Sequence, residues 1–76
     1  MTGGATGPTL LYLFDTTTAA MWAEDVAEER SIPAEVVPAP PEAKSKCGLA
    51  LRTLSRHAAL LEEALREEGV PFTPYG

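Results

Sequence analysis

The chain of 76 residues is long enough for one small domain and too short for two hydrophobic cores. An apolar share of 45% excludes a disordered chain, and no apolar run approaches the roughly 20 residues that a membrane span needs. A net charge of −5 argues against nucleic acid, because phosphate binding selects for basic surfaces. We therefore expect one domain over residues 9–76, after a flexible leader over residues 1–8, with neither nucleic acid nor membrane as a partner.

The first half of the chain predicts a strand, a helix and a second strand. The apolar run Thr9–Phe14 predicts a strand that is buried on both faces. The cap-forming residues Asp15–Thr18 predict a helix start, and Pro33 ends that helix because the residue before a proline avoids α geometry. The segment Ala34–Pro38 predicts the second strand. The apolar residues of the helix recur at helical spacing: Ala19, Trp22, Ala23, Val26 and Ala27.

The second half begins with a loop and a third strand. Prolines exclude regular structure from Pro38 to Lys46, since proline cannot donate a backbone hydrogen bond. Leu49 and Leu51 then alternate with their neighbours at the period of a strand. Thr53 or Ser55 can cap the helix that follows.

A second helix and a final strand complete the chain. The apolar stripe of this helix is expected to contain Leu54, Ala58, Leu61 and Leu65. Gly69 provides the left-handed residue that ends it. The segment Val70–Thr73 predicts the last strand, and Pro71 and Pro74 place that strand at a sheet edge.

The element order βαββαβ predicts an α+β fold of the ferredoxin-like split βαβ type. Right-handed crossovers give a four-stranded antiparallel sheet of order 4-1-3-2, with two helices on one face. We expect the helices to pack through Trp22, Val26, Leu61 and Leu65. The topology also brings the first helix start, with Thr16, Thr17 and Thr18, to the same end of the sheet as the loop before the third strand.

That loop holds Cys47, the only cysteine of the chain. Strand parity places Cys47 on the face of Leu49 and Leu51, toward the N-terminus of the first helix. A helix N-terminus and nearby lysines favour a thiolate, so Lys44 and Lys46 support a reactive thiol. Gly48 leaves room for a second molecule to approach. The alternative is that Cys47 is a buried filler, since free cysteines are often buried.

A single cysteine excludes an internal disulfide and indicates a reducing compartment, the cytoplasm. His57 is the only histidine, so the chain alone cannot build a cysteine-based zinc site, and we expect neither metal nor cofactor. His57 should lie at the opposite end of the sheet from Cys47, which argues against a Cys–His catalytic pair.

A family resemblance rests on several of these residues. A strand ending in Phe14 precedes the threonine-rich helix start Thr16–Thr18, and Pro38-Ala39-Pro40 precedes the run Ser45-Lys46-Cys47-Gly48-Leu49-Ala50. In this pattern the chain resembles the selenium/sulfur-carrier-like family of short bacterial domains, over residues 9 to 73. The family pattern has a basic residue after Pro-x-Pro and a serine pair before the cysteine, whereas Pro41 and Lys46 stand at those places here.

The resemblance implies that Cys47 carries sulfur or selenium as a persulfide or selenosulfide between a donor protein and an acceptor protein. Thr16, Thr17, Thr18, Lys44, Ser45, Lys46 and Gly48 are then the expected binding residues around Cys47. In this reading the chain is a transfer protein more than a turnover enzyme. The alternative is a non-catalytic interaction or regulatory module whose cysteine is structural or redox-sensing. Because both helices cover one sheet face, the other face is free to form a homodimer or bind a partner.

Overall fold

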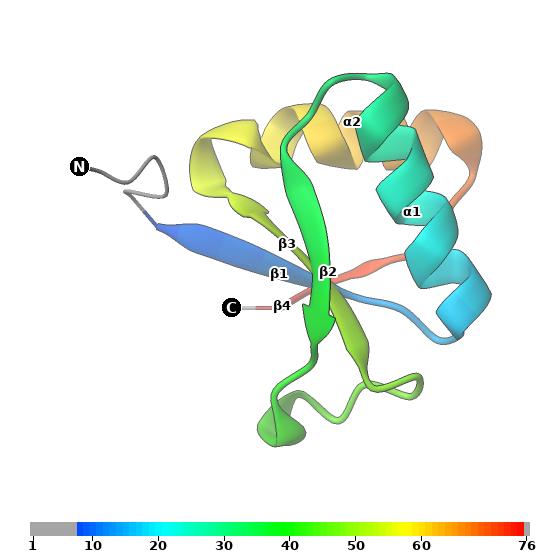
Figure 1. The fold of residues 1–76 in the computed structure, drawn as a ribbon, viewed down its shortest axis with the longest axis vertical. Coiled ribbons are helices and arrows are strands. Elements are labelled where there is room, and N and C mark those ends of the chain that lie inside the picture. Colours follow the sequence, from blue (N-terminus) through cyan, green and yellow to red (C-terminus); the bar gives the residue numbers. More distant parts are fainter. Residues whose placement is uncertain (1–7, 76) are drawn as a thin grey trace.

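The computed structural model describes residues 8–75, which form an α+β fold of one antiparallel sheet and two α-helices (Figure 1). The predicted leader over residues 1–8 lies outside the described residues except for Pro8, whose carbonyl oxygen accepts a hydrogen bond from the backbone N–H of Ser55. The elements, in chain order, are β1 (Thr9–Leu13), α1 (Thr17–Glu29), β2 (Ala34–Pro38), the 3-10 turn η1 (Pro41–Ala43), β3 (Leu49–Leu54), the 3-10 turn η2 (Ser55–His57), α2 (Ala58–Glu68) and β4 (Thr73–Tyr75).

The sheet order from one edge to the other is β2-β3-β1-β4, which is 4-1-3-2 when the strands are taken from the β4 edge. All three neighbouring pairs are antiparallel. Leu13 at the end of β1 pairs with Ala50 near the start of β3, and also with Thr73 of β4. The β1–α1 turn, the β2–β3 loop and the α2–β4 turn therefore lie at the same end of the sheet, as predicted.

Both helices pack on one face of the sheet. Tyr12 of β1 and Leu51 of β3 pair across the two central strands and are fully buried. Their side chains share one hydrophobic cluster with apolar residues of α1 and α2, such as Val26 and Leu65. Burying these side chains supplies the main stabilisation of a chain this short.

Helix α1 begins with the predicted threonine cap, because the hydroxyl oxygen of Thr16 accepts a hydrogen bond from the N–H of Ala19 at 3.0 Å. The expectation that Trp22 lies in the core is wrong, since its side chain is 42% exposed. Small residues form the buried stripe instead, and Trp22 lies beside that stripe: Ala19, Ala20, Ala23, Val26 and Ala27. The helix ends at Glu29, before Pro33 is reached, because Ser31 takes a left-handed conformation and the N–H of Ile32 bonds back to the Ala27 carbonyl at 2.8 Å.

Helix α2 does not use the predicted caps. Thr53 lies within β3, where its hydroxyl donates to the carbonyl oxygen of Pro33 at 2.7 Å, and Ser55 opens the 3-10 turn η2. The α-helix begins at Ala58 without a side-chain cap. Leu54, expected in the apolar stripe of this helix, belongs to β3 instead, whereas Leu61 and Leu65 are buried as predicted. Gly69 ends α2 at φ 80°, as predicted.

The last strand starts later than expected. The N–H of Val70 donates to the Leu65 carbonyl at 2.9 Å, and Pro71 has no N–H, so neither residue can start a ladder with β1. Pairing begins at Thr73 and includes Pro74, which lies opposite Tyr12 at the sheet edge. The edge position of this strand is thus confirmed and its predicted span of Val70–Thr73 is wrong.

No helix of the described residues, 8–75, covers the second face of the sheet. Because successive side chains of a strand alternate between faces, Leu11 and Leu13 point away from buried Tyr12, and both are partly exposed. Arg52 and Glu35 lie on this face too and form an ion pair at 2.6 Å. The uncovered face is therefore apolar around one charged pair.

Candidate functional site

The β2–β3 loop, residues 39–48, projects beyond the sheet at the end away from α2 (Figure 1). Its base is closed by a hydrogen bond of 2.9 Å from the N–H of Ala39 to the carbonyl of Gly48. Two left-handed residues shape it, Lys44 at φ 55° and Gly48 at φ 75°. A side chain at Gly48 would be strained by this φ, although no atom lies within 4 Å of where its Cβ would stand. The space beside Gly48 is consequently open.

Cys47 is half-buried and packs against the hydrophobic core at the start of β3. Cys47 therefore lies on the side of the sheet that the helices cover, and its position toward the N-terminus of α1 stays a prediction. Its Sγ atom lies 3.7 Å from Ser45 Oγ and 3.7 Å from the carbonyl oxygen of Leu49. Ser45 Oγ in turn donates to the same carbonyl at 3.1 Å. The thiol thus has one inner side, against the core and these two oxygen atoms, and one outer side toward solvent.

The Ser45 hydroxyl has a clear chemical use in this arrangement. Its proton is directed at the Leu49 carbonyl, so the one proton of the neutral thiol can be accepted either by Ser45 Oγ or by the same carbonyl. A hydroxyl rotates freely, so the same group can turn and donate to the sulfur when Cys47 is charged.

The threonines of the α1 start lie at the same end of the sheet as Cys47, but they do not bond to it. Thr16 and Cys47 each lie three residues beyond the paired residues Leu13 and Ala50. The hydroxyl of Thr16 is occupied by its own helix cap, and Thr17 and Thr18 are exposed. Within residues 8–75, the hydrogen bonds of the Cys47 side chain go to Ser45 and Leu49.

The lysines of the loop differ from three of the four arginines, the exception being Arg56, which is exposed and forms no ion pair with a described residue either. Arg30 pairs with Glu67 at 2.7 Å, and this hydrogen bond raises the pKa of its guanidinium. Arg52 and Arg66 also have glutamate partners. Lys44 and Lys46 are exposed, and neither forms an ion pair with a described residue.

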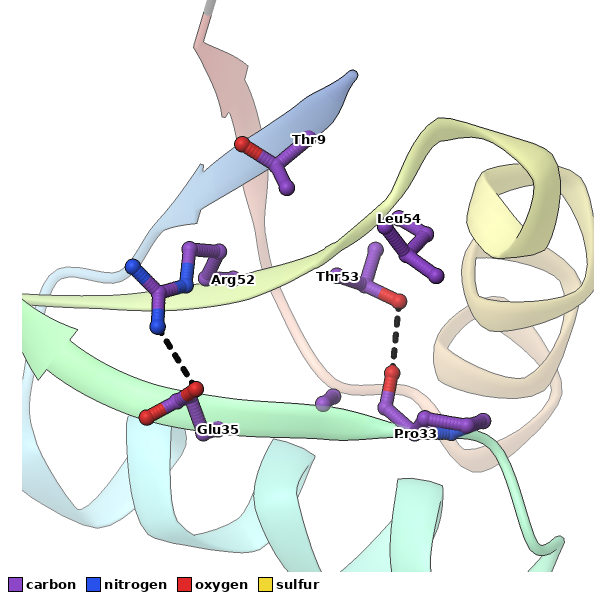
Figure 2. A pocket seen from close by; sticks show the side chains of 7 residues that line it. Thr9, Pro33, Glu35, Arg52, Thr53 and Leu54 are labelled. Atoms are coloured by element: carbon purple, nitrogen blue, oxygen red, sulfur yellow. Dashed lines mark hydrogen bonds and ion pairs between the residues drawn. The ribbon is translucent and has the colours of Figure 1, made fainter. Parts of the chain in front are cut away.

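A second polar region lies at the other end of β3, in a groove of about 440 Å³ (Figure 2). Thr9, Pro33, Glu35, Arg52, Thr53 and Leu54 contribute to its lining. Figure 2 shows the Arg52–Glu35 ion pair and the Thr53–Pro33 hydrogen bond crossing from β3 to β2. Because these groups already satisfy one another, the groove offers a ligand no free charge.

Other reactive groups are either structural or far from the thiol. His57 follows the C-terminal end of β3, opposite Cys47, so the two do not form a catalytic pair. Tyr12 is buried and donates to a Glu62 carboxylate oxygen at 2.9 Å; burial and then this bond raise its pKa above the ordinary range. No group of three potential metal ligands occurs among the described residues. Neither helix of residues 8–75 is long and apolar enough to cross a membrane.

The sequence predicts Ser45 as a binding residue, but it does not mark the acceptor of the Ser45 hydroxyl. That acceptor is the main-chain carbonyl of Leu49, which holds both the Ser45 hydroxyl and the Cys47 thiol. A carbonyl is common to every residue, so no residue type marks it in the sequence. The Ser45-x-Cys47 spacing is the feature from which this contact can be anticipated.

Comparison with known proteins gives one match. The model of a family described as "Putative Se/S carrier protein-like" matches residues 9–74, which include the sheet, both helices and the Cys47 loop. No curated protein and no solved structure matches the chain.

Proposed function

The chain belongs to the Se/S carrier protein-like family, and on this premise we propose that it carries sulfur or selenium on Cys47. The observation that carries the proposal is the placement of the only cysteine in the β2–β3 loop, where its side chain is half-buried and open space lies beside the adjacent Gly48. The sheet and helices hold this loop at a fixed position. The cargo is a persulfide or a selenosulfide, passed between donor and acceptor proteins in a reducing compartment such as the cytoplasm.

Loading is a transfer between two sulfur atoms. The Cys47 thiolate attacks the terminal sulfur of a donor persulfide, the bond between the donor's two sulfurs breaks, and the donor leaves as a thiolate. Cys47 then holds the terminal sulfur, and an acceptor thiolate removes it by the same step in reverse. With selenium, the terminal atom is selenium and the electron count is unchanged.

Each residue around the thiol has a part in this step. The Ser45 hydroxyl turns from the Leu49 carbonyl to donate to the charged sulfur. Gly48 leaves the approach open for the donor's sulfur. Thr16, Thr17 and Thr18 place the positive end of α1 at the same end of the sheet as the thiol.

The ferredoxin-like split βαβ is the fold class that we propose for the domain. The element order, the antiparallel strand order and the shared core of both helices support it. This topology brings three connections to one end of the sheet, and the carrier thiol lies in one of them.

Accessibility of Cys47 in the folded protein tests the proposal. We expect iodoacetamide to alkylate native Cys47 at pH 7 at a rate similar to or faster than that of glutathione. The Ser45→Ala variant should react more slowly while keeping the same fold by circular dichroism. A thiol that reacts only after denaturation would contradict the carrier function and favour a structural cysteine.

A second function, a docking module, is favoured by the uncovered sheet face around Leu11 and Leu13. The occupant that we infer is a second copy of the chain, because Arg52 and Glu35 give this face balanced charge in an otherwise acidic protein. Sedimentation at micromolar concentration should detect a dimer, and Leu11→Lys should convert it to a monomer. A wild-type protein that sediments only as a monomer would remove this second function.

A further inference from the structure

We propose that the Cys47 loop docks an acidic protein surface, so that the donor and acceptor of the proposed carrier function present negative charge around their own sulfur. The property that leads to this partner is the distribution of charge over the molecule. The loop, residues 39–48, contains two lysines and one glutamate, for a net charge of +1. Since the whole chain carries −5, the remainder carries −6.

The positive charge of the loop is not neutralised within the domain. Arg30, Arg52 and Arg66 each form an ion pair with a glutamate. Lys44 and Lys46 are exposed and form no ion pair with any described residue. In a chain with almost twice as many acidic as basic residues, the two cations beside the thiol remain available to another molecule.

Both lysines lie close enough to Cys47 to influence what approaches it. Lys46 is its direct neighbour, and the Cα of Lys44 lies within about 11 Å because consecutive Cα atoms are 3.8 Å apart. That distance is about one Debye length at 0.1 M salt, so the charge reaches the approaching group. Gly48 on the other side of the thiol adds no obstacle to a broad partner surface.

The geometry favours an acidic protein over a small anion. A small anion needs donors that converge on it, as an anion-binding pocket provides. Here the inner side of the thiol faces the Leu49 carbonyl and the core, while the lysines are exposed on the outside of the loop. Charges placed in this way guide the encounter with a larger surface and set its orientation.

Peptide disulfides test the proposal without a carrier cargo. Three cysteine peptides, flanked by glutamates, by serines or by lysines, are activated as 2-thiopyridyl disulfides. The Cys47 thiolate attacks the peptide sulfur, the disulfide breaks, and pyridine-2-thione leaves and is followed by its absorbance. In low salt we expect the acidic peptide to react about three- to tenfold faster than the neutral one, and the basic peptide to react more slowly.

The variants separate a local effect from an effect of net charge. In K44A/K46A the ratio of acidic to neutral rates should fall to about one, whatever the change in the neutral rate itself. Arg56→Ala is the matched control, since Arg56 is exposed and lies beyond the opposite end of β3. Arg56→Ala should keep the wild-type ratio of acidic to neutral rates. Adding 0.5 M salt to K44A/K46A should likewise leave the ratio of that variant unchanged.

Three results would overturn the proposal. The first is an unchanged ratio in K44A/K46A, and the second is an equal loss of the ratio in Arg56→Ala. The third is that the small dianion 5,5′-dithiobis(2-nitrobenzoate) depends on the lysines while the acidic peptide does not, which would indicate a small anionic donor. Disulfide exchange needs no persulfide, so failure of the carrier function would leave these rates unaffected.

Discussion

The two ends of β3 carry similar polar residues, and the structure uses them differently. At the C-terminal end, Arg52 pairs with Glu35 at 2.6 Å and Thr53 donates to the Pro33 carbonyl at 2.7 Å. At the N-terminal end, among residues 8–75, Lys46 has no ionic partner and the hydrogen bonds of the Cys47 side chain are long, at 3.7 Å. Polar groups that hold β2 to β3 are unavailable to a ligand, whereas those beside Cys47 are available. The C-terminal end thus serves the fold, while the N-terminal end is where we propose the carrier function.

The middle of β3, between the two ends, should show the largest loss of stability. Leu51 is fully buried beneath both helices, so Leu51→Ala leaves a cavity in the only core of the described domain. We expect a loss of about 2–5 kcal/mol in the free energy of unfolding, measured by urea denaturation. A loss below about 1 kcal/mol would mean that the helices do not pack on this strand as described.

The C-terminal end of β3 is tested by Thr53→Val, which keeps the shape of the side chain and removes its hydroxyl. The Pro33 carbonyl then loses the hydroxyl of buried Thr53 as a partner; because Pro33 is itself exposed, water can replace that hydroxyl, and unfolding should require about 0.5–1.5 kcal/mol less free energy. Alkylation of Cys47 in the folded variant should proceed at the wild-type rate. A changed rate would show that the two ends of β3 are coupled, which would contradict their separate roles.

Tyr12, which pairs with Leu51 between the two ends, should give the sheet a dependence on alkaline pH. Burial raises its pKa in the folded state, so the unfolded chain loses the proton first, near pH 10. The contribution of protonated Tyr12 to the free energy of unfolding is fully present below pH 10. Above pH 10 it decreases by about 1.4 kcal/mol per pH unit. Tyr12→Phe should unfold with a shallower alkaline slope in urea titrations; an identical slope would contradict this role.

The N-terminal end of β3, beside Cys47, should show a small loss of stability and the clearest loss of thiol reactivity. Gly48 is at φ 75°, so Gly48→Ala should cost about 1 kcal/mol and shift the loop beside the thiol. We expect the alkylation rate of Cys47 to fall several-fold, when both proteins are compared at equal degrees of folding. Gly69→Ala is the matched control, because it places the same strain at φ 80° far along the chain from Cys47 and should leave the rate unchanged.

Local sequence patterns predicted the order of the helices and strands. The predictions that were wrong concern residues whose environment depends on segments far away in the sequence. Thr16 caps α1 and Gly69 ends α2 as predicted, because caps depend on neighbouring residues. Thr53 has the same chemistry as a cap, yet its hydroxyl bonds to Pro33, twenty residues away. Trp22 fits a helical stripe but lies at its margin, where alanines already fill the space against the sheet.

In the candidate site, too, the neighbours of Cys47 in the sequence could be predicted, whereas the contacts that depend on backbone conformation could not. The sequence places Lys44, Ser45, Lys46 and Gly48 around Cys47, and the register of β1 with β3 brings the α1 start to the same end of the sheet. The contact of the thiol with the Leu49 carbonyl depends on the turn at Gly48, a conformation that residue types alone do not specify.

The central claim, that Cys47 carries a transferable chalcogen atom, is tested most directly by intact mass spectrometry. The folded protein is incubated with a cysteine desulfurase and cysteine, beside the Cys47→Ser variant. The account predicts that the wild type gains the mass of one sulfur atom, that the variant gains none, and that a thiol acceptor removes the added mass. A wild-type mass that stays unchanged, or a gain that Cys47→Ser shares, would contradict it.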